Sequence, residues 1–324
     1  MMRKALCLLS VAMIAGLAFT GEAPAQKWPK HLSVVCGPEG GSGFALLSVW
    51  APIINKASGA NLSVQATGGN SVNAIMVHRK QADFGLSTSA LVAEGWKGAD
   101  WTSNLKLTDL RTIAIFQSYV TQYYGRAKKN IRALDDMTGR HVSLGNAGTS
   151  TDVWGRRLFS LFNVKPSRIS NVAPGQGNDL LKDDLLDIQA VHGSVPHNSI
   201  VELQLSDDLI VFGLSKERGE QFMAKYPGLY TFTIPAGTYK KQTEPFHSFS
   251  EPVVLVGHKD LPADLVYQVT KATFEKQKDL EAGYKPFRQV KIENAVQSPV
   301  LMHPGAHKYY AEKGIKIPDA AVPK

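Results

Sequence analysis

The sequence predicts an α/β protein with two lobes, each built on a mixed, mostly parallel sheet flanked by helices, and with two strands joining the lobes. Short β-prone segments alternate with glycine-rich loops and amphipathic helices, which is the order of elements in a parallel sheet. Two β-prone runs, residues 111–126 and 247–258, are longer than a typical strand and suit segments that cross between lobes. The 324 residues are enough for two cores.

Residues 1–25 have the composition of a secretory signal peptide. Arg3 and Lys4 precede an apolar run from Ala5 to Phe19, and Ala23-Pro24-Ala25 offers a small-residue cleavage site. The apolar run is too short to span a bilayer as a helix. Cleavage leaves 299 of the 324 residues and lowers the formal net charge from +8 to +7. We therefore expect a soluble protein of the periplasm.

Composition also narrows the classes of partner. Cys36 is the single cysteine that remains after cleavage, so an internal disulfide is excluded and this side chain is expected to be a small buried hydrophobe. Lys and Arg are interspersed with Asp and Glu, and no basic run contains interleaved aromatic residues, which argues against nucleic-acid binding. The positive charge suits small anions or an acidic partner surface. We expect a monomer with no nucleic-acid partner, no cofactor and no metal ion.

Residues 141–164, HVSLGNAGTSTDVWGRRLFSLFNV, form the clearest strand–loop–helix unit. Gly145–Thr151 is a loop of small and hydroxyl residues, and the apolar residues after Asp152 recur at helical spacing, with Trp154 and Phe159 expected in the core. The first turn of such a helix has unpaired N–H groups and a partial positive charge. A carboxylate or phosphate fits there. The alternative is an ordinary capped helix with Thr151 as its N-cap.

Comparable loops precede this unit. They follow strands predicted at 31–36, 61–66 and 84–87 and comprise residues 37–43, 67–71 and 87–89. The chain then continues with strands predicted at 170–173, 188–192, 209–212 and 230–233, and with helices at 44–56, 72–77, 179–187, 222–226, 261–278 and 303–310. In an open parallel sheet the loops lie at the carboxyl ends of the strands, where ligands bind. None has the spacing of a dinucleotide fingerprint or a phosphate-binding P-loop.

The two long runs divide the chain into lobes. Lobe 1 is expected to contain residues 26–120 and 250–324, and lobe 2 residues 121–249. Residues 116–124 are expected to form the hinge, and residues 247–258 the return crossing.

Eight stretches together indicate a family. They are GPEGGSG at 37–43, QATGGNSVNAI at 65–75, QADFGLSTS at 81–89, LDDMTGRHVSLGNAGTSTD at 134–152, KYPGLYTFTIPAGTY at 225–239, HKDLPADLVYQVTKATFE at 258–275, IENAV at 292–296 and HPGAHKYYAEKG at 303–314. Because these stretches occur in this order after a predicted signal peptide, the chain resembles the TAXI family, the extracytoplasmic solute receptors of TRAP transporters. The resemblance covers about residues 31–314.

This resemblance implies a type II periplasmic binding fold that closes on a ligand and delivers it to the membrane subunits of a TRAP permease. It implies as ligand a small organic acid: a dicarboxylate, a keto acid or an amino acid such as glutamate. Two departures bear on the choice. Phe44 stands where the family often has a Tyr-Tyr pair, and Ser87–Ala90 replaces a frequent Gln-Ser-Asp. The aspartate of that Gln-Ser-Asp would be a partner for the ammonium group of an amino acid, and it is missing here. We therefore favour a carboxylic acid without an amino group as the ligand.

We predict that the ligand lies between two groups of loop residues. The predicted ligand-binding residues are Gly41, Ser42, Gly43, Phe44, Asn70, Thr88 and Ser89 on one side, and Asn146, Gly148, Thr149, Ser150, Thr151, Gly193 and Ser194 on the other. Tyr239 either lines the cleft or closes a loop.

The same residues bear on three alternative roles: a hydrolase, a metal site and a histidine that binds the ligand. A hydrolase would use Ser150 as nucleophile, but G-T-S-T is not the G-x-S-x-G elbow, and we expect no enzyme activity. His303 and His307 have the spacing of metal ligands on a helix, but the glutamate of the metalloprotease motif is missing, so we expect an exposed histidine at a helix start. His192 either donates to a carboxylate when protonated or is a structural histidine.

A periplasmic sensor that reports to a signalling kinase has the same cleft as a transport receptor. The sequence of the receptor does not separate these two functions. A neighbouring gene for a multi-span permease favours transport, and one for a sensor kinase favours signalling.

Overall fold

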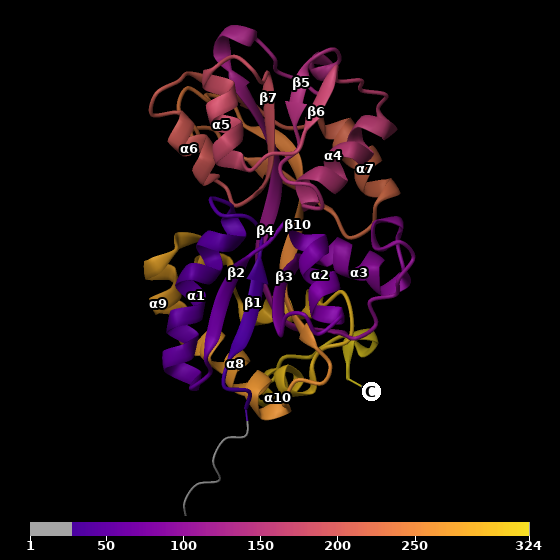
Figure 1. Cartoon of the computed structure of the whole chain (residues 1–324), viewed down its shortest axis with the longest axis vertical. Coiled ribbons are helices and arrows are strands. Elements are labelled where there is room, and N and C mark those ends of the chain that lie inside the picture. The colour runs from indigo at the N-terminus through magenta and orange to yellow at the C-terminus, as the bar shows by residue number, and fades with distance from the viewer. Residues whose placement is uncertain (1–27, 324) are drawn as a thin grey trace, which may run out of the picture.

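Two long strands run through the whole molecule in the computed structural model, which describes residues 28–323 (Figure 1). The strands are β1 Leu32–Cys36, β2 Leu62–Ala66, β3 Phe84–Thr88, β4 Leu110–Arg126, β5 His141–Ser143, β6 Arg168–Ser170, β7 Ile188–Gly193, β8 Leu209–Phe212, β9 Tyr230–Ile234 and β10 Phe246–His258. The helices are α1 Ser42–Ser58, α2 Asn70–His78, α3 Ser89–Lys97, α4 Ser150–Leu161, α5 Pro174–Lys182, α6 Asn198–Leu203, α7 Lys216–Lys225, α8 Ala263–Glu275, α9 Gln277–Gly283 and α10 Pro304–Glu312. The predicted signal peptide lies outside the described residues.

The strand pairing separates the crossing strands from the others. In the described sheet the order is β2-β1-β3-β10-β4-β7-β5-β6, with β8 on β4 and β9 on β10. β1 pairs in parallel with β2 and β3, and β5 pairs in parallel with β6 and β7. The antiparallel pairs all contain β4 or β10. The structure therefore has the predicted mixed sheet, with a parallel group at each end of two antiparallel crossing strands.

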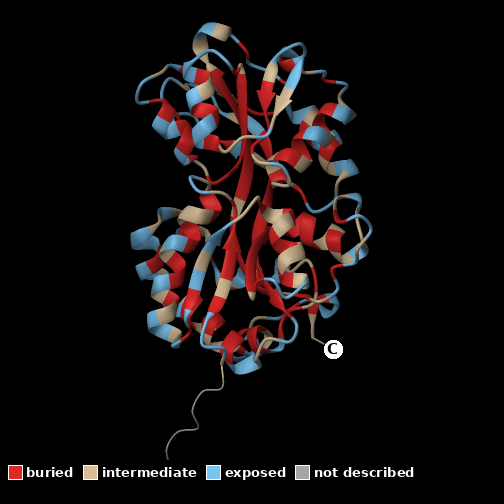
Figure 2. Cartoon of the chain, in the orientation of Figure 1, coloured by how far each residue is buried: buried red, intermediate tan, exposed pale blue. Residues whose placement is uncertain are grey.

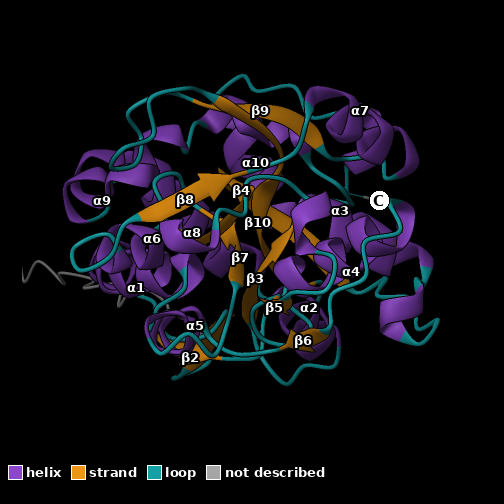
Figure 3. Ribbon diagram, turned by 90° about the horizontal axis from the view of Figure 1, so that it is seen from above, coloured by secondary structure: helices purple, strands orange, loops and turns teal. Residues whose placement is uncertain are grey.

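The predicted lobe boundaries at 120/121 and 249/250 fall within β4 and β10. We keep this division as a proposal and use the names lobe 1 and lobe 2 for its two parts. In Figure 1, β1–β3 with α1–α3 and α8–α10 lie in the lower half, and β5–β7 with α4–α7 lie in the upper half. Viewed along the long axis, helices surround the central strands β3, β4, β7 and β10 (Figure 3).

Each half has its own buried core, and the central strands are buried along most of their length (Figure 2). One core contains Trp50, Phe116 and Phe287. Another contains Trp154 and Phe159, as predicted, together with Ala90 and Leu91 of α3. Because α3 belongs to the proposed lobe 1, its first turn packs into the core of lobe 2, so the two lobes are in direct contact here.

Some local predictions need correction. The predicted helix 261–278 begins at Ala263 and ends at Glu275, where α9 follows after one residue. His303 is not exposed: its side chain is only 1% exposed, and it caps α10 by accepting a hydrogen bond from the N–H of Gly305. Burial lowers the pKa of His303 to about 4. Cys36 is buried as predicted, and burial raises the pKa of its thiol to about 12. None of the described helices has the length and apolar character needed to cross a bilayer.

Candidate functional site

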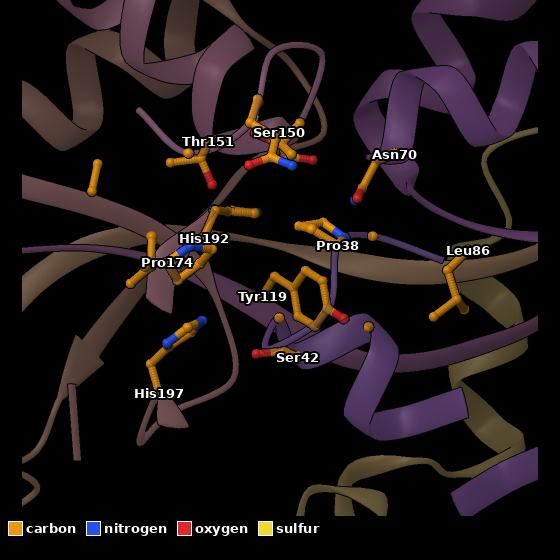
Figure 4. Close-up of a pocket in the computed structure, with 18 residues that line it drawn as sticks. Pro38, Ser42, Asn70, Leu86, Tyr119, Ser150, Thr151, Pro174, His192 and His197 are labelled. Carbon is orange, nitrogen blue, oxygen red and sulfur yellow. Dashed lines mark hydrogen bonds between the residues drawn. The ribbon is translucent and has the colours of Figure 1, made fainter. Parts of the chain in front are cut away.

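A cavity of about 60 Å³ lies where the loops of the two halves meet (Figure 4). The loops after β1 and β5, the end of β7 and the first turns of four helices line it. Figure 4 shows Ser150 and Thr151 on one side, Ser42 on the opposite side, and Tyr119 and His192 between them. The lining residues are Gly37, Pro38, Gly41, Ser42, Gly43, Asn70, Leu86, Tyr119, Gly145, Asn146, Thr149, Ser150, Thr151, Pro174, Ala190, Val191, His192 and His197.

Three of the helices that begin at this cavity have no side-chain cap. These are α1, which begins at Ser42, α2, which begins at Asn70, and α5, which begins at Pro174. None of the three has an acidic residue in its first turn. The N–H groups of a first turn have no partner within their own helix, and the helix dipole gives them a partial positive charge. α1 and α2 therefore border the cavity with N–H groups that their own helices do not satisfy, although the N–H of Ser71 is bonded to Gly148. Pro174 of α5 has no N–H to offer.

The fourth helix, α4, is different because it satisfies part of its own N-terminus. Its N-cap is Thr149, not Thr151 as the sequence suggested, and the hydroxyl of Thr149 accepts a hydrogen bond from the N–H of Asp152 at 3.2 Å. The carboxylate of Asp152 in turn accepts from the N–H of Gly148 at 3.2 Å. An acidic residue at the third helical position also balances the helix dipole. The alternative of an ordinary capped helix is thus correct for α4, although Ser150 and Thr151 still line the cavity.

Direct hydrogen bonds join the two sides of the cleft. The hydroxyl groups of Ser42 and Ser194 lie 3.1 Å apart, and those of Thr88 and Ser150 lie 3.2 Å apart. The N–H of Ser71 donates to the carbonyl oxygen of Gly148 at 3.3 Å. On the outer side of α3 and α4, Arg157 forms a forked ion pair with Glu94 at 2.8–3.1 Å. The structure therefore shows the two lobes in contact around the cavity.

His192 lies between two polar groups of the protein. Its Nδ1 lies 2.8 Å from the hydroxyl of Thr121, and its Nε2 lies 3.2 Å from Oε1 of Glu251. Glu251 is fully buried and accepts from the indole of Trp154 at 2.6 Å and from the N–H of Ala90 at 3.2 Å. Nε2 makes no hydrogen bond within the protein, but it lies beside the buried carboxylate of Glu251, so the geometry favours the structural interpretation of this histidine.

His197 presents a fixed donor to the cavity. Its Nδ1 accepts a hydrogen bond from the N–H of Ser199 at 3.3 Å and lies 2.8 Å from the hydroxyl of Ser199. Burial, followed by repulsion from His192, lowers the pKa of His197 to about 4, so its imidazole is neutral at pH 7. In a neutral imidazole whose Nδ1 is an acceptor, the proton is on Nε2. His197 therefore offers an N–H group from Nε2.

Eight predicted ligand-binding residues line the cavity: Gly41, Ser42, Gly43, Asn70, Asn146, Thr149, Ser150 and Thr151. Six others lie next to it: Phe44 in the first turn of α1, Thr88 and Ser89 at the start of α3, Gly148 before α4, and Gly193 and Ser194 at the end of β7. Tyr239 lies farther back, where its hydroxyl donates to Gln122 and accepts from the N–H of His197. The structure thus places Tyr239 behind the cavity as a support for a loop.

The cavity also contains residues outside the predicted ligand-binding set. The largest are Tyr119 and His197, together with the apolar Pro38, Leu86, Pro174 and Val191. Tyr119 lies in the predicted hinge, residues 116–124, where strand alternation alone does not say which of the tyrosines faces a ligand. His197 follows Val195-Pro196 after β7, and no motif marks it. Their positions depend on how β4 and β7 pair, which no local pattern encodes.

The lining residues include no Lys, Arg, Asp or Glu. Within residues 28–323 there is also no cluster of three or more His, Cys, Asp or Glu side chains suited to a metal ion. The hydroxyl of Ser150 is paired with Thr88, His192 is paired with Thr121, and His197 is paired with Ser199. The arrangement therefore supplies neutral donors and acceptors, without a base positioned on a nucleophile.

Comparisons with known proteins agree with this fold. Residues 36–314 match the NMT1-like family. MatC from Rhodopseudomonas palustris, solved with bound malate, has a TM-score of 0.56 at 12% identity over 89% of this chain and 98% of MatC. The periplasmic binding protein BugD has a TM-score of 0.52 at 13% identity over 81% and 86% of the two chains. The substrate binding protein of an amino acid ABC transporter has a TM-score of 0.52 at 10% identity over 80% and 100%. The predicted two-lobed periplasmic binding fold is confirmed.

Proposed function

Because the chain belongs to the NMT1-like family, we propose that it is a periplasmic solute receptor that binds a small carboxylate between its lobes and delivers it to the membrane subunits of a TRAP-type transporter. Within that family we assign it to the TAXI group, on the eight sequence stretches described above. The signal-peptide composition of residues 1–25 supports export. We propose that the receptor acts as a monomer.

One observation supports the carboxylate assignment: the uncapped N-termini of α1 and α2 meet at one cavity that has no charged side chain in its lining. An anion at a helix N-terminus gains about 0.3–1 kcal/mol, and up to about 2 kcal/mol where the site is partly buried. A carboxylate also accepts several N–H bonds at once, which are stronger than bonds between neutral groups. A cation in the same cavity would have no carboxylate beside it.

The contacts between the lobes support a binding role that depends on closure. Bonds such as Ser42 to Ser194 and Thr88 to Ser150 form only when the two sides of the cleft meet. A ligand that contacts both sides stabilises this arrangement over an open one, because it gains contacts in the closed state alone. A permease can then distinguish a loaded receptor from an empty one by shape. MatC, which shares the fold, is a precedent for a bound carboxylate, since its structure contains malate.

The test is a binding screen of the purified mature protein. Thermal shift and isothermal titration calorimetry with a panel of carboxylates, amino acids, sugars and inorganic anions are expected to give a dissociation constant for at least one carboxylate. Binding of sugars alone would overturn the proposal.

Thr151 refines the test, because it lies in the first turn of α4 and lines the cavity. The change Thr151→Ala is expected to weaken carboxylate binding by about tenfold, the loss of one hydrogen bond to a charged group. An unchanged dissociation constant would remove Thr151 from the site. Turnover of an ester or peptide substrate that Ser150→Ala abolishes would instead indicate an enzyme.

A further inference from the structure

The two lobes touch at several places around the cavity, and these places differ in their distance from the crossing strands β4 and β10. β3 lies beside β10 and β7 lies beside β4, whereas β2 is the edge strand of its group and β5 lies beyond β7. The loop after β2, residues 67–69, and the loop after β5, residues 144–149, are therefore farther from the crossing strands than the ends of β3 and β7. Figure 3 shows β2, β5 and α2 on one side of β4 and β10.

These two loops meet through their backbones, in a contact between residues 68–71 and 147–149 that we call the outer contact. The N–H of Ser71 donates to the carbonyl oxygen of Gly148 at 3.3 Å, and the hydroxyl of Ser71 donates to the same oxygen. A Cβ on Gly69 would lie 2.6 Å from Cγ2 and 2.9 Å from Cα of Thr149. The φ of Gly69 is +145°, a conformation that favours glycine. The outer contact therefore depends on the missing side chain of Gly69.

The contact between α3 and α4 is of a stronger kind. Arg157 makes its forked ion pair with Glu94 at 2.8–3.1 Å. Nearby, the buried carboxylate of Glu251 accepts from the N–H of Ala90 and from the indole of Trp154. Separation of α4 from α3 would break the ion pair and take the indole donor from a buried charged group, which costs more than the loss of a bond between neutral groups.

The contact at the start of α1 consists of hydroxyl groups. The hydroxyl of Ser194 lies 3.1 Å from that of Ser42 and 3.1 Å from that of Tyr284. Ser194 directly follows β7, beside the crossing strand β4. A rotation about the crossing strands displaces each contact in proportion to its distance from them. The outer contact, which has neutral bonds that water can replace, therefore separates first and most widely.

We propose that residues 68–71 and 147–149 form a gate through which the solute enters and leaves the cavity, and that the lack of a side chain at Gly69 lets this gate shut. Asn70 and Thr149 also line the cavity, so the gate opens directly into it. This inference rests on the proposed receptor function and adds the route of entry. The gate controls how fast a solute is exchanged, whereas the cavity behind it selects the solute.

The experiment measures entry with iodoacetate, a small carboxylate whose iodide is displaced by a thiolate. Ser150→Cys provides the thiol, because Ser150 lines the cavity and is only 2% exposed. A cysteine at a helix N-terminus is reactive. The rate of alkylation at position 150, followed by mass spectrometry of peptides, reports entry of this probe. Cys36 is the internal control, because it is buried with a pKa of about 12 and stays unmodified while the protein is folded.

Three variants of the gate are compared in this background. Gly69→Ala is expected to raise the rate of alkylation at least tenfold, because its Cβ prevents the gate from shutting. Ser71→Ala removes one hydrogen bond of the gate and is expected to raise the rate by up to about tenfold. Gly68→Ala is the matched control with an unchanged rate, because its Cβ meets its nearest atoms at 3.5 and 3.6 Å. Equal rates in all three variants would overturn the inference.

Tyr284→Phe tests entry at the start of α1, because it removes a hydroxyl bonded to Ser194. Its rate is expected to equal that of the background protein, and a rise larger than that of Ser71→Ala would place the entrance there instead. Alkylation of Cys36 together with position 150 in both Gly69→Ala and Ser71→Ala would show unfolding and would also contradict the gate. A binding screen without any carboxylate hit would overturn the proposed ligand, while the expected order of these rates would still support the gate.

Discussion

The N-termini of α1 and α4 border the same cavity and follow similar loops, yet they differ in what satisfies their N–H groups. The first turn of α1 is Ser42-Gly43-Phe44, with no cap and no acid. The first turn of α4 is Ser150-Thr151-Asp152, with Thr149 as cap and Asp152 bonded to Gly148. The helix whose sequence looked most like an anion site is therefore the one that already has its own carboxylate. A glycine-rich loop before a helix indicates an anion site only when the helix leaves its N–H groups free.

The largest expected effect on ligand affinity comes from crowding the contact between Gly193 and Ser42, at the α1 end of the cleft. A Cβ on Gly193 would lie 2.6 Å from both the hydroxyl of Ser42 and a ring carbon of His197. Overpacking of this kind costs about 1–3 kcal/mol. Gly193→Ala is therefore expected to keep the lobes apart and to weaken ligand binding by up to roughly a hundredfold in calorimetry. Gly175→Ala is the control, because a Cβ there meets nothing within 4 Å. Equal affinities of the two variants would show that closure does not need this contact.

A fall in pH is expected to lower the stability of the folded protein through His197, which lines the cavity. Its pKa is lowered from 6.5 to about 4 in the folded protein. Between these values the unfolded chain binds a proton that the folded chain does not, so stability is lost as the pH falls below about 6.5. From pH 7 to pH 5 the loss is about 2 kcal/mol, measured by chemical denaturation. His197→Asn keeps a capping oxygen for α6 without a titrating group, and an equal pH dependence in that variant would contradict the prediction.

A carboxylate placed on α1 would remove its difference from α4. Phe44 is the third residue of α1, as Asp152 is of α4, so Phe44→Asp gives α1 the same acid. Phe44→Asn has the same shape without the charge and loses the same apolar packing. Phe44→Asp is expected to bind the carboxylate ligand roughly tenfold more weakly than Phe44→Asn, because the new charge repels an anion at this helix end. Identical affinities in calorimetry would place the ligand's charge elsewhere.

Removal of the N-cap of α4 is expected to have the smallest effect, a modest loss of folding stability. Thr149→Ala removes the hydroxyl that accepts from the N–H of Asp152. Loss of a cap costs about 1 kcal/mol, which lowers the melting temperature by about 2 °C. Thr149→Ser keeps the acceptor and is expected to melt like the native protein. A fall in affinity as large as that of Phe44→Asp would mean that α4, rather than α1, carries the main binding role.

The sequence by itself determined the α/β class, the two crossing strands and most of the loops at the cleft. These features are local: alternation of β-prone segments and helices, runs too long for one lobe, and glycine beside hydroxyl residues are readable without knowing what packs against what. Eight of the predicted site residues line the cavity for the same reason, because loops after parallel strands gather at one edge.

Only the tertiary structure decided which helix ends are free, how large the cavity is, and which deeper side chains face it. Tyr119 and His197 reach the cavity through the pairing of β4 with β7, and the state of Nε2 of His197 follows from one bond to Ser199. The role of Asp152 depends on the hydrogen bond that its carboxylate accepts from the N–H of Gly148. The volume of the cavity depends on how closely the two lobes approach each other. These are contacts between segments far apart in the chain, and their energies are absent from any local pattern.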